Sequence, residues 1–407
     1  MRFGAILGFC GACIAFYIGA GFSTMQEVMQ YEASYGSLFP VVILVAAAIY
    51  VYTNLSFATN GNRLQIARGG DIYEKYCNCF GRRFGKIVGT FYDYFASFFC
   101  YMCFIVMCGG ANSTAMQQWG LPNAVGAVVL AAAVIVTAVF GLNGILKALS
   151  KLGPVIIVLI LIVATVTAIT GAGSYRESLA AIDAGQYDLV QVGGGSPFAS
   201  GASYGGFVIL WFAAFLSEIG ARNKLREVNT GMFASTLFIF GAATICCLAL
   251  ISHIDATAHA DIPALVLANS IHPVLGQIYA VIVFCGIYTT AVPLLWTGVG
   301  RVAREGTGRY RLFTVIGGVI GCVVACFLPY KGLVNILYGL NGYLGFILVA
   351  FMIIYDIRSR MSRKRLDLIP EAGPAPAEGP APAARVSAGE AETEAGETAP
   401  AEAEDAP

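Results

Sequence analysis

Long apolar runs alternate with short polar connections along the chain, and this pattern sets the expected elements. A helix needs about 20 predominantly apolar residues to cross the hydrocarbon core of a bilayer. The first apolar run continues without a small-residue cleavage site, so we expect it to be retained as a helix. Ten segments are predicted to span the membrane, at roughly 4–30, 37–58, 84–110, 122–141, 153–172, 203–220, 229–252, 272–300, 312–329 and 331–355.

The composition excludes a soluble protein of several domains. Hydrophobic residues make up 57% of the 407 residues and charged residues only 12%, whereas about a quarter of an ordinary globular protein is charged. The mean hydropathy is +0.73, so most of the chain is expected to face lipid or other helices. The sequence lacks a glycine-rich phosphate loop, an HExxH motif and a nucleophile elbow. We therefore predict an all-α polytopic membrane protein that is not an enzyme and has no nucleic-acid partner.

Lysine and arginine gather on alternate connections. Of the 23 basic residues in 1–369, 21 lie on the side that holds Arg2, and the opposite side holds only Arg176 and Lys331. In membrane proteins the cytoplasmic connections carry the excess of basic residues. We therefore predict a multi-pass protein of the bacterial cytoplasmic membrane with both termini in the cytoplasm.

The last 38 residues differ from the rest of the chain. From Pro370 onward there are nine acids, one base (Arg385), seven of the fifteen prolines and no aromatic residue. Such a segment cannot bury enough apolar surface to offset its conformational entropy. We predict a ten-helix membrane core over 1–369 and a disordered acidic cytoplasmic tail over 370–407, whose protein partner the sequence does not identify.

Neither disulfide nor metal chemistry is expected. Ten of the twelve cysteines fall within predicted helices, and Cys77 and Cys79 lie on a cytoplasmic connection without zinc-site spacing. His253, His259 and His272 lie in or beside one outer connection, and no pair has the i, i+4 spacing of helical metal ligands. We interpret that connection as an exposed polar loop.

The first apolar segment is interrupted near its middle. Residues 19–22 read Gly-Ala-Gly-Phe, and at about 1.5 Å per residue they lie near the bilayer midplane. Ser23 and Thr24 follow, with Gln26 and Glu27 each three residues further on, which makes two overlapping capping boxes. This pattern predicts a broken helix with a first half at 4–18, an unwound stretch at 19–22 and a second half at 23–33.

Unwound backbone at membrane depth is tolerated where protein or a water-filled cavity satisfies its polar groups. The free amides that start the second half would attract an anionic group such as a carboxylate. The carbonyls that end the first half suit a cation. The alternative is close helix packing through small residues, but packing does not account for the polar caps that follow.

Three polar side chains on other segments are further candidates. Asp93, within 84–110, is an intramembrane acid that is suited to coupling-ion or proton traffic, or else to a hydrogen bond with a neighbouring tyrosine. The hydroxyls of Thr289 and Thr290, within 272–300, could ligate sodium or bond back to their own helix. We expect all three side chains to point into the same volume as the break.

Three motifs carry a resemblance to a known family. IGAGFSTMQEVMQYEASYG is similar to the opening motif of the YkvI-like bacterial membrane proteins, and GIYTTAV and LYGLNGYLGF resemble later segments of that family. The family belongs with the amino acid–polyamine–organocation transporters. The resemblance implies a LeuT-type fold of two inverted five-helix repeats, about 1–173 and 203–356, flanking a midplane site.

The resemblance also implies particular site residues. The substrate would contact Gly19, Ala20, Gly21 and Phe22. Tyr101 is a further candidate contact that the family pattern does not fix. A sodium site would use the carbonyls of Ala15 and Ile18 and the hydroxyls of Thr289 and Thr290. The sixth helix should be broken as well, yet 203–220 has no clear interruption at its middle.

These observations lead to one functional hypothesis and two alternatives. We predict a secondary active transporter that moves an amino acid or similar small zwitterion by alternating access, coupled to sodium and without another cofactor. The first alternative is proton coupling through Asp93 or Glu27. The second is a membrane sensor or scaffold that uses the acidic tail to recruit a partner.

Overall fold

The computed structural model describes residues 2–66, 70–140 and 152–361. Within these residues the chain is helical, with helices joined by turns and loops and no strand. The predicted tail and the connection 141–151 lie outside them.

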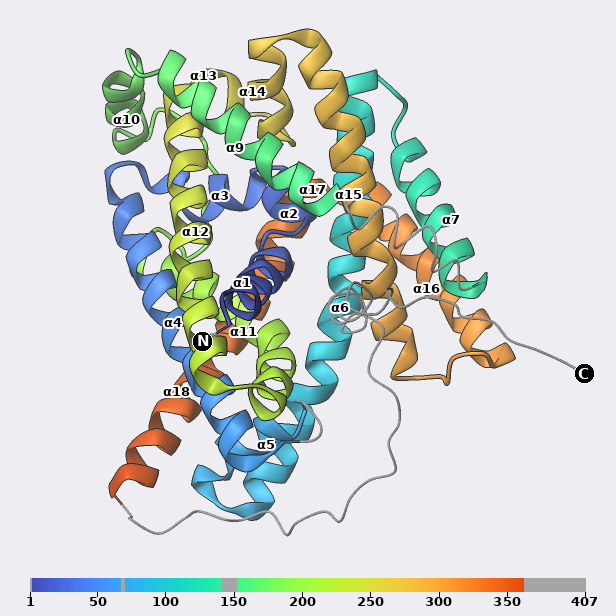
Figure 1. Cartoon of the computed structure of the whole chain (residues 1–407). Coiled ribbons are helices and arrows are strands. Elements are labelled where there is room, and N and C mark those ends of the chain that lie inside the picture. Colours follow the sequence, from blue (N-terminus) through green and yellow to red (C-terminus); the bar gives the residue numbers. More distant parts are fainter. Residues whose placement is uncertain (1, 67–69, 141–151, 362–407) are drawn as a thin grey trace, which may run out of the picture. The chain divides into compact units, whose positions relative to one another are not determined.

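Each of the ten predicted spans coincides with one helix or with one interrupted helix (Figure 1). The first span is divided into three pieces, and the last contains a π-helical turn. In chain order the spans are α1 (Phe3–Tyr17) with α2 (Ala20–Ser23) and α3 (Gln26–Tyr31), α4 (Phe39–Leu64), α6 (Arg82–Trp119), α7 (Val125–Phe140), α9 (Leu152–Thr170), α11 (Pro197–Arg222), α12 (Leu225–Ser252), α15 (Pro273–Gly300), α16 (Gly308–Phe327), and α17 (Tyr330–Leu333) continuing through η3 (Val334–Tyr338) into α18 (Gly339–Met361).

Short helices occupy the connections between the spans. Two of them, α5 and η2, lie on the side that the sequence assigns to the cytoplasm, and η1, α10, α13 and α14 lie on the opposite side. They are η1 (Ala33–Leu38), α5 (Asp71–Cys77), η2 (Asn78–Phe80), α10 (Tyr175–Asp183), α13 (Ile254–Thr257) and α14 (Pro263–Ile271).

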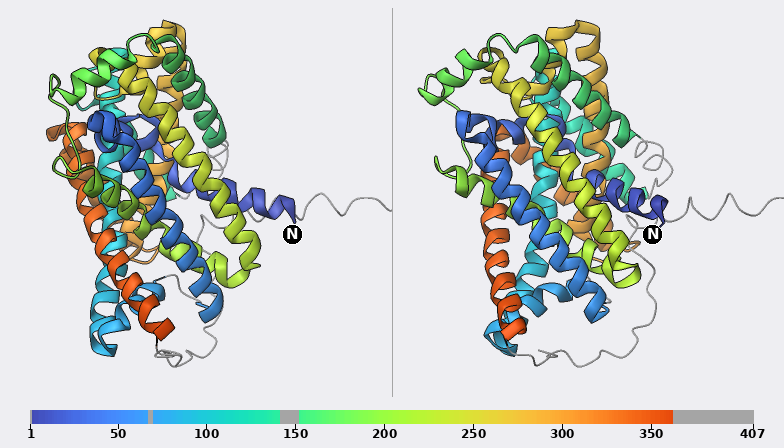
Figure 2. Two further views of the ribbon diagram at one scale, coloured as in Figure 1. Left: turned by 90° about the vertical axis from the view of Figure 1, so that its left-hand side faces the viewer. Right: turned by 60° about the vertical axis from the view of Figure 1, so that its left-hand side comes forward.

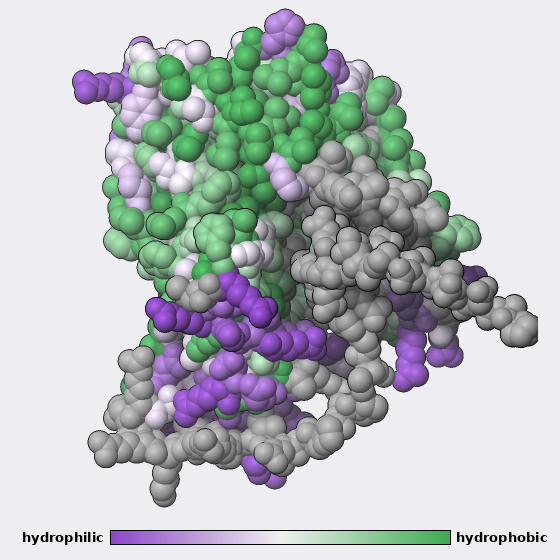
Figure 3. All heavy atoms as spheres, viewed as in Figure 1, coloured by the Kyte–Doolittle hydropathy of each residue, from purple (hydrophilic) through white to green (hydrophobic). Residues whose placement is uncertain are grey.

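The surface of the helices fits a bilayer. Among the described residues, seven helical stretches are long and apolar enough to cross a membrane, and α1 and α7 are shorter apolar helices. Figure 3 shows apolar side chains over most of the visible face, while hydrophilic side chains gather at the end where α5 lies. The chain is therefore a multi-pass membrane protein.

Small residues let α11 pack closely against α4. A Cβ atom built on Gly220 would overlap the carbonyl oxygen of Ala58, and one on Gly61 would overlap the carbonyl oxygen of Ser217. Lipid tails give apolar helices no reason to associate, so close backbone approach through small residues is what stabilises such pairs. This contact holds α11 in the interior of the bundle.

The opposite side of α11 packs on α18 in the same way. Gly206 faces Gly342 and Gly345, and a Cβ atom on Gly345 would overlap the carbonyl oxygen of Gly206. The glycines of α11 thus serve two backbone contacts, one on each side of the helix.

The first helix sits differently. α1 packs chiefly on α12, and its first turns reach out beyond the neighbouring helices (Figure 2). Phe3 is 78% exposed and Leu7 62% exposed, which suits apolar side chains in contact with lipid. Only the C-terminal end of α1, from Cys13 onward, enters the core.

Candidate functional site

Helical winding stops directly after α1. The Ile18 backbone has φ −79° and ψ 79°, outside the helical region. The amide of Gly19 bonds to the carbonyl of Tyr17, only two residues back, at 2.9 Å. The predicted break in the first helix is therefore confirmed, and it lies at Ile18–Gly19.

The helix is interrupted a second time directly after the four-residue helix α2. Met25 adopts a left-handed conformation with φ 59°, which is uncommon for a residue other than glycine. Its amide bonds to the carbonyl of Phe22 at 2.9 Å. The predicted unwound stretch at 19–22 is wrong in detail, because residues 20–23 form the single helical turn α2 between two breaks.

Thr24 stabilises this second break through its side chain. Its hydroxyl donates to the carbonyl of Gly21 at 2.7 Å and accepts from the amide of Gln26 at 3.2 Å. The capping boxes predicted one helical start at Ser23–Thr24, whereas α3 starts at Gln26. The Thr24 hydroxyl thus caps the amide of Gln26, two residues further on, rather than the amide of Glu27, three residues further on.

Neighbouring helices satisfy the polar backbone at the breaks. Tyr279 of α15 donates its hydroxyl proton to the carbonyl of Ser23 at 2.6 Å. The amide of Ala264, in α14, bonds to the carbonyl of Thr24 at 3.2 Å. The Tyr330 hydroxyl, in α17, lies 3.1 Å from the Thr24 hydroxyl. Helices from the second half of the chain therefore surround α2, as irregular backbone at membrane depth requires.

Glu27 lies against the turn that carries Gly21. A Cβ atom on Gly21 would overlap the Glu27 carboxylate, so only glycine leaves room for it here. Glu27 is 4% exposed, and its carboxylate accepts a hydrogen bond from the hydroxyl of Tyr338. An intramembrane acid thus sits at the break itself.

Tyr338 ends the π-helical turn η3 of the last span. π-turns are rare and occur frequently at functional sites. Next to this turn, the Gln30 side-chain amide donates to the carbonyl of Lys331 at 3.0 Å. The sequence did not single out Tyr338, although it lies in the LYGLNGYLGF segment that carried the resemblance.

A second buried acid, Glu32, was also missed. It directly follows α3, is 0% exposed, and neither of its carboxylate oxygens has a hydrogen-bond partner among the described residues. It falls within the predicted second half of the broken helix, 23–33, where no motif marks it as a buried acid.

Aromatic rings enclose the space between these acids and α11. Tyr31 stacks on Tyr204 with ring centroids 4.6 Å apart, and Tyr17 meets the same ring edge-on at 5.8 Å. Tyr50 in turn contacts Tyr17 edge-on at 5.4 Å. These rings belong to α1, α3, α4 and α11, so the end of α1 is held in an aromatic cluster.

The predicted sodium ligands are only partly brought together. Ile18 is 8% exposed, whereas Ala15 lies on the exposed side of α1. The hydroxyls of Thr289 and Thr290 both donate to the carbonyl of Gly286, at 2.8 and 3.0 Å. Those hydroxyl protons are therefore engaged within α15, although α15 packs against α2.

Tyr101 lies away from the break. Its hydroxyl donates to the carbonyl of Gly317 in α16 at 2.9 Å, and its Cβ packs on Gly298 of α15. This side chain fastens α6 to α15 and α16, because the small residues there leave room for the ring. The expectation that it faces the break is not met.

Asp93 is also placed elsewhere. It forms an ion pair with Arg301, and both side chains are about a third exposed, at 34% and 38%. The Arg301 guanidinium also lies over the ring of Tyr94, 4.5 Å from its centroid. The expectation that Asp93 points into the same volume as the break was wrong, because a base on α15 binds it near the cytoplasmic ends of α6 and α15.

The sixth span, α11, is continuous from Pro197 to Arg222. The resemblance implies a second broken helix here, and the structure does not contain one. The Gly205–Gly206 pair instead meets Ile49 of α4 and Gly342 of α18. Ser196 caps the start of α11 by accepting from the amide of Ala199 at 3.3 Å.

Cys77 lies outside the membrane-spanning helices, at the end of α5. Burial raises the pKa of its thiol to about 12. A thiol with that pKa is almost entirely protonated at neutral pH and a poor nucleophile. Cys77 is therefore a packing residue of the α5 connection.

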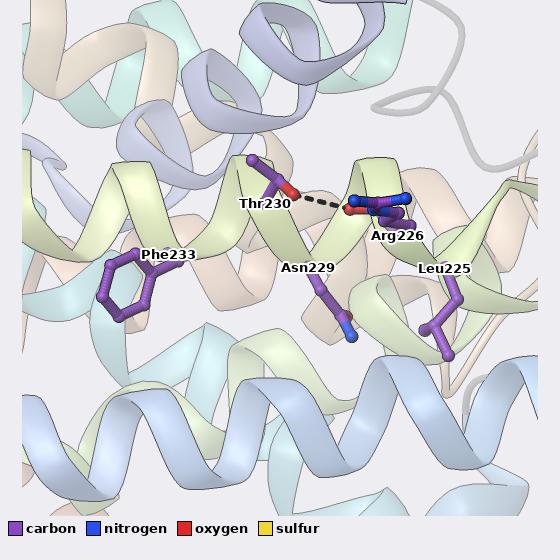
Figure 4. Close-up of a pocket in the computed structure, with 5 residues that line it drawn as sticks. All are labelled: Leu225, Arg226, Asn229, Thr230 and Phe233. Carbon is purple, nitrogen blue, oxygen red and sulfur yellow. Dashed lines mark hydrogen bonds between the residues drawn. The ribbon is translucent and has the colours of Figure 1, made fainter. Parts of the chain in front are cut away.

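A surface hollow along the first turns of α12 lies apart from these features (Figure 4). It is lined by Leu225, Arg226, Asn229, Thr230 and Phe233. The Thr230 hydroxyl bonds to the carbonyl of Arg226, one turn back in the same helix, at 2.8 Å. None of the residues at the break contributes to it.

The broken first helix and the surrounding spans define an all-helical membrane protein of the LeuT type. The crystal structure of MhsT in complex with L-phenylalanine is similar, with a TM-score of 0.55 and 18% identity over 85% of this chain and 88% of that chain. So is a manganese transporter of Eremococcus coleocola in complex with an aromatic bis-isothiourea compound, with a TM-score of 0.50 and 15% identity over 86% and 78%. No family model and no curated protein matches the chain. At these identities the likeness shows the fold.

Proposed function

We propose that the protein is a secondary active transporter that carries an amino acid or a similar small zwitterion across the membrane by alternating access. The observation that carries this proposal is the doubly interrupted first helix at Ile18–Gly19 and Thr24–Met25. Broken helices beside a midplane site are the recurrent binding device of transporters with inverted repeats. The similar MhsT structure, which holds L-phenylalanine, supports this choice of substrate class.

A zwitterion matches the charges at the break. The substrate carboxylate would accept hydrogen bonds from the amides of residues 19–22, with Ala20, Gly21 and Phe22 as donors. Its ammonium group would face the carboxylate of Glu27, which lies against the same turn. A substrate with a carboxylate alone would place two negative charges close together in a medium of low dielectric constant, which is costly.

Sodium coupling is the first form of the proposal. The carbonyls of Ala15 and Ile18 and the hydroxyls of Thr289 and Thr290 would ligate the ion when the end of α1 approaches α15. The hydroxyl protons of both threonines point to Gly286, which leaves their oxygen lone pairs as acceptors for a cation.

Proton coupling is the second form, and one observation favours it. Glu27 is buried beside the break, whereas Asp93 is neutralised by Arg301 at the cytoplasmic ends of α6 and α15. Of the two acids that the sequence offered, we therefore propose Glu27 as the group that binds both a proton and the substrate.

Family and location complete the proposal. We assign the chain to the YkvI-like family on its three motifs, and to the bacterial cytoplasmic membrane with both termini inside on its distribution of basic residues. The bilayer is its environment and a small molecule its partner.

A binding screen followed by uptake tests this function. Purified protein is heated with single amino acids, with and without sodium, and a ligand raises the unfolding temperature by mass action. Hits are then tested for counterflow in proteoliposomes. The proposal predicts a stabilising amino acid that also exchanges across the membrane, and it is refuted if no stabilising ligand is transported.

Two variants sharpen the screen. Thr289→Ala with Thr290→Ala should abolish sodium-stimulated uptake if these hydroxyls ligate the ion, and unchanged sodium dependence would exclude that site. A chain that ends at residue 369 should keep its uptake, whereas a scaffold that works through its tail would lose its phenotype and show no uptake in either form.

A further inference from the structure

Glu32 is a fully buried acid without a counter-charge. It is 0% exposed, and neither carboxylate oxygen has a hydrogen-bond partner in the described part of the chain. Buried charges are normally paired or hydrogen-bonded, because removing them from water is otherwise very costly. Glu32 therefore needs a positive charge that the folded helices do not supply.

Glu27 lies close enough to Glu32 for the two carboxylates to repel each other. They are five positions apart in the chain, roughly 7.5 Å along a helix axis. The ion pair found within the described residues joins Arg301 and Asp93, so neither buried acid takes part in one. In the part of the chain that the structure describes, the two acids thus share an interior without an ion pair to either of them.

The groups around the two acids confirm this imbalance. Lys331 of α17 donates its ammonium group to the carbonyl of Ala258 instead, at 2.9 Å. Among the described residues, the titratable side chains that face Glu27 or Glu32 are weak acids: Tyr17 from α1, Tyr31 from α3, Cys103 from α6, Tyr204 from α11, Cys246 and Cys247 from α12, Tyr330 from α17 and Tyr338 from η3.

The smallest charge that can balance such a pair is a proton. A bound metal ion needs several ligands around it, and no three His, Cys, Asp or Glu side chains converge within residues 2–66, 70–140 and 152–361. Glu27 keeps a hydrogen bond from Tyr338, whereas Glu32 has none. The ionised form of Glu32 is therefore stabilised less by hydrogen bonds than the ionised form of Glu27.

Glu32 also lies between the break and one surface of the protein. It is followed by η1, where Ser37 and Leu38 are exposed and the Ser37 amide bonds to Asp183 of α10 at 2.9 Å. Glu27, one and a half turns earlier, lies against Gly21 at the break. In chain order Glu32 therefore lies nearer than Glu27 to the exposed residues beside α10.

We propose that Glu32 is a proton-binding site that acts together with Glu27 to couple a proton gradient to transport. This inference rests on the proposed function in its proton-coupled form. Loading adds one proton from water on the α10 side to the carboxylate of Glu32. Transfer leaves Glu32 ionised and Glu27 protonated, and release returns the same proton to water on the opposite side.

The test compares Glu32→Gln with wild type in proteoliposomes. The amide has the shape of the acid but carries no exchangeable acidic proton. We expect substrate counterflow without a gradient to stay within about twofold, and accumulation driven by a pH gradient to fall about tenfold or more, a typical size of coupling between two sites. Glu32→Asp, which keeps a carboxyl, should retain most of the accumulation.

Glu227→Gln is the matched control. Glu227 is a buried acid of α12, but it accepts a hydrogen bond from the amide of Arg2 at 2.9 Å. Its replacement should leave gradient-driven accumulation unchanged. The proposal is overturned if Glu32→Gln keeps its pH-driven accumulation, or if it loses counterflow as well, since that loss would make Glu32 part of the substrate site.

Infrared difference spectroscopy separates this inference from the proposed function. A pH jump on the protein in lipid, without substrate, should show the carbonyl stretch of a protonated carboxyl, and Glu32→Gln should remove it. A spectrum identical in the two proteins refutes the proton site even if transport is found. Absence of transport in wild type refutes the proposed function, while the spectrum still reports on Glu32.

Discussion

The first and sixth spanning helices both carry closely spaced glycines, yet only the first is interrupted. In the first helix, Gly21 leaves room for the carboxylate of Glu27. In the sixth, Gly205 and Gly206 leave room for side chains and backbone of α4 and α18. A glycine pair in a membrane helix therefore has two different uses, close packing and making room for a polar group.

The residues that follow the glycines distinguish the two cases. Gly21 is followed by Thr24, whose hydroxyl bonds to the backbone at both sides of the second break. Gly206 is followed by an apolar run up to Ser217, whose hydroxyl bonds to the carbonyl of Ala213, one turn back. A polar side chain that supplies the missing backbone hydrogen bonds permits a break; without one, the helix remains wound.

The largest effect is expected from Gly206→Ala. Its Cβ would overlap the carbonyl oxygen of Gly342, and backbone cannot move aside as a side chain can. Overpacking of this kind costs about 1–3 kcal/mol and more where backbone is in the way, so the unfolding temperature in detergent should fall markedly. Gly241→Ala, on an open face of α12 with no atom within 4 Å of the new Cβ, is the control. Equal stability of the two variants would contradict the packing interpretation.

Gly21→Ala should instead affect transport more than stability. Its Cβ would meet the end of the flexible Glu27 side chain, which can rotate away at the loss of its present position. We expect uptake to fall about tenfold, a loss of about 1.4 kcal/mol, with a nearly unchanged unfolding temperature. Gly11→Ala on the exposed face of α1 should change neither. A Gly21→Ala variant with a lowered unfolding temperature and normal uptake would show instead that Gly21 serves helix packing.

Tyr338→Phe is expected to have a smaller effect. It removes the hydroxyl that bonds to Glu27, and a typical intramolecular hydrogen bond contributes about 0.5–1.5 kcal/mol. Uptake should fall several-fold, measured as initial rate in proteoliposomes. Tyr101→Phe removes a hydroxyl that bonds to Gly317 and should reduce uptake less. A larger loss of uptake in Tyr101→Phe than in Tyr338→Phe would indicate that the substrate binds beside Tyr101.

Asp93→Asn should have the smallest effect. The ion pair with Arg301 is about a third exposed, and exposed pairs contribute roughly 0–1 kcal/mol. The pH dependence of uptake should therefore match wild type, whereas Glu27→Gln should alter it. If Asp93→Asn abolished the pH dependence of uptake, Asp93 rather than Glu27 would be the proton-coupling acid.

Much of the fold follows from the sequence because apolar run length is a direct physical requirement of the bilayer. The lengths of the apolar runs predicted the ten spans, and the capping-box pattern that includes Thr24 and Glu27 predicted the broken first helix. The unwound residues were misplaced because a single turn such as α2 leaves no periodicity to detect. The absence of a break in α11 agrees with the lack of an interruption in its sequence, against the expectation from the resemblance.

The site was harder to predict because it is built by contacts between distant segments. Tyr338 is about 310 residues from Glu27 in the chain, and nothing in its own surroundings indicates that it bonds to an acid. Asp93 looked unpaired because its partner, Arg301, lies 208 residues further on. Glu32 carries no local pattern at all, and only its burial without a partner sets it apart.

The most direct test of the account is a cryo-electron-microscopy map of the protein in lipid with a bound amino acid from the binding screen. We expect two interruptions, at Ile18–Gly19 and Thr24–Met25, with ligand density between the amides of α2 and the carboxylate of Glu27. A continuous helix from Phe3 to Tyr31, or ligand density away from α2, would contradict it.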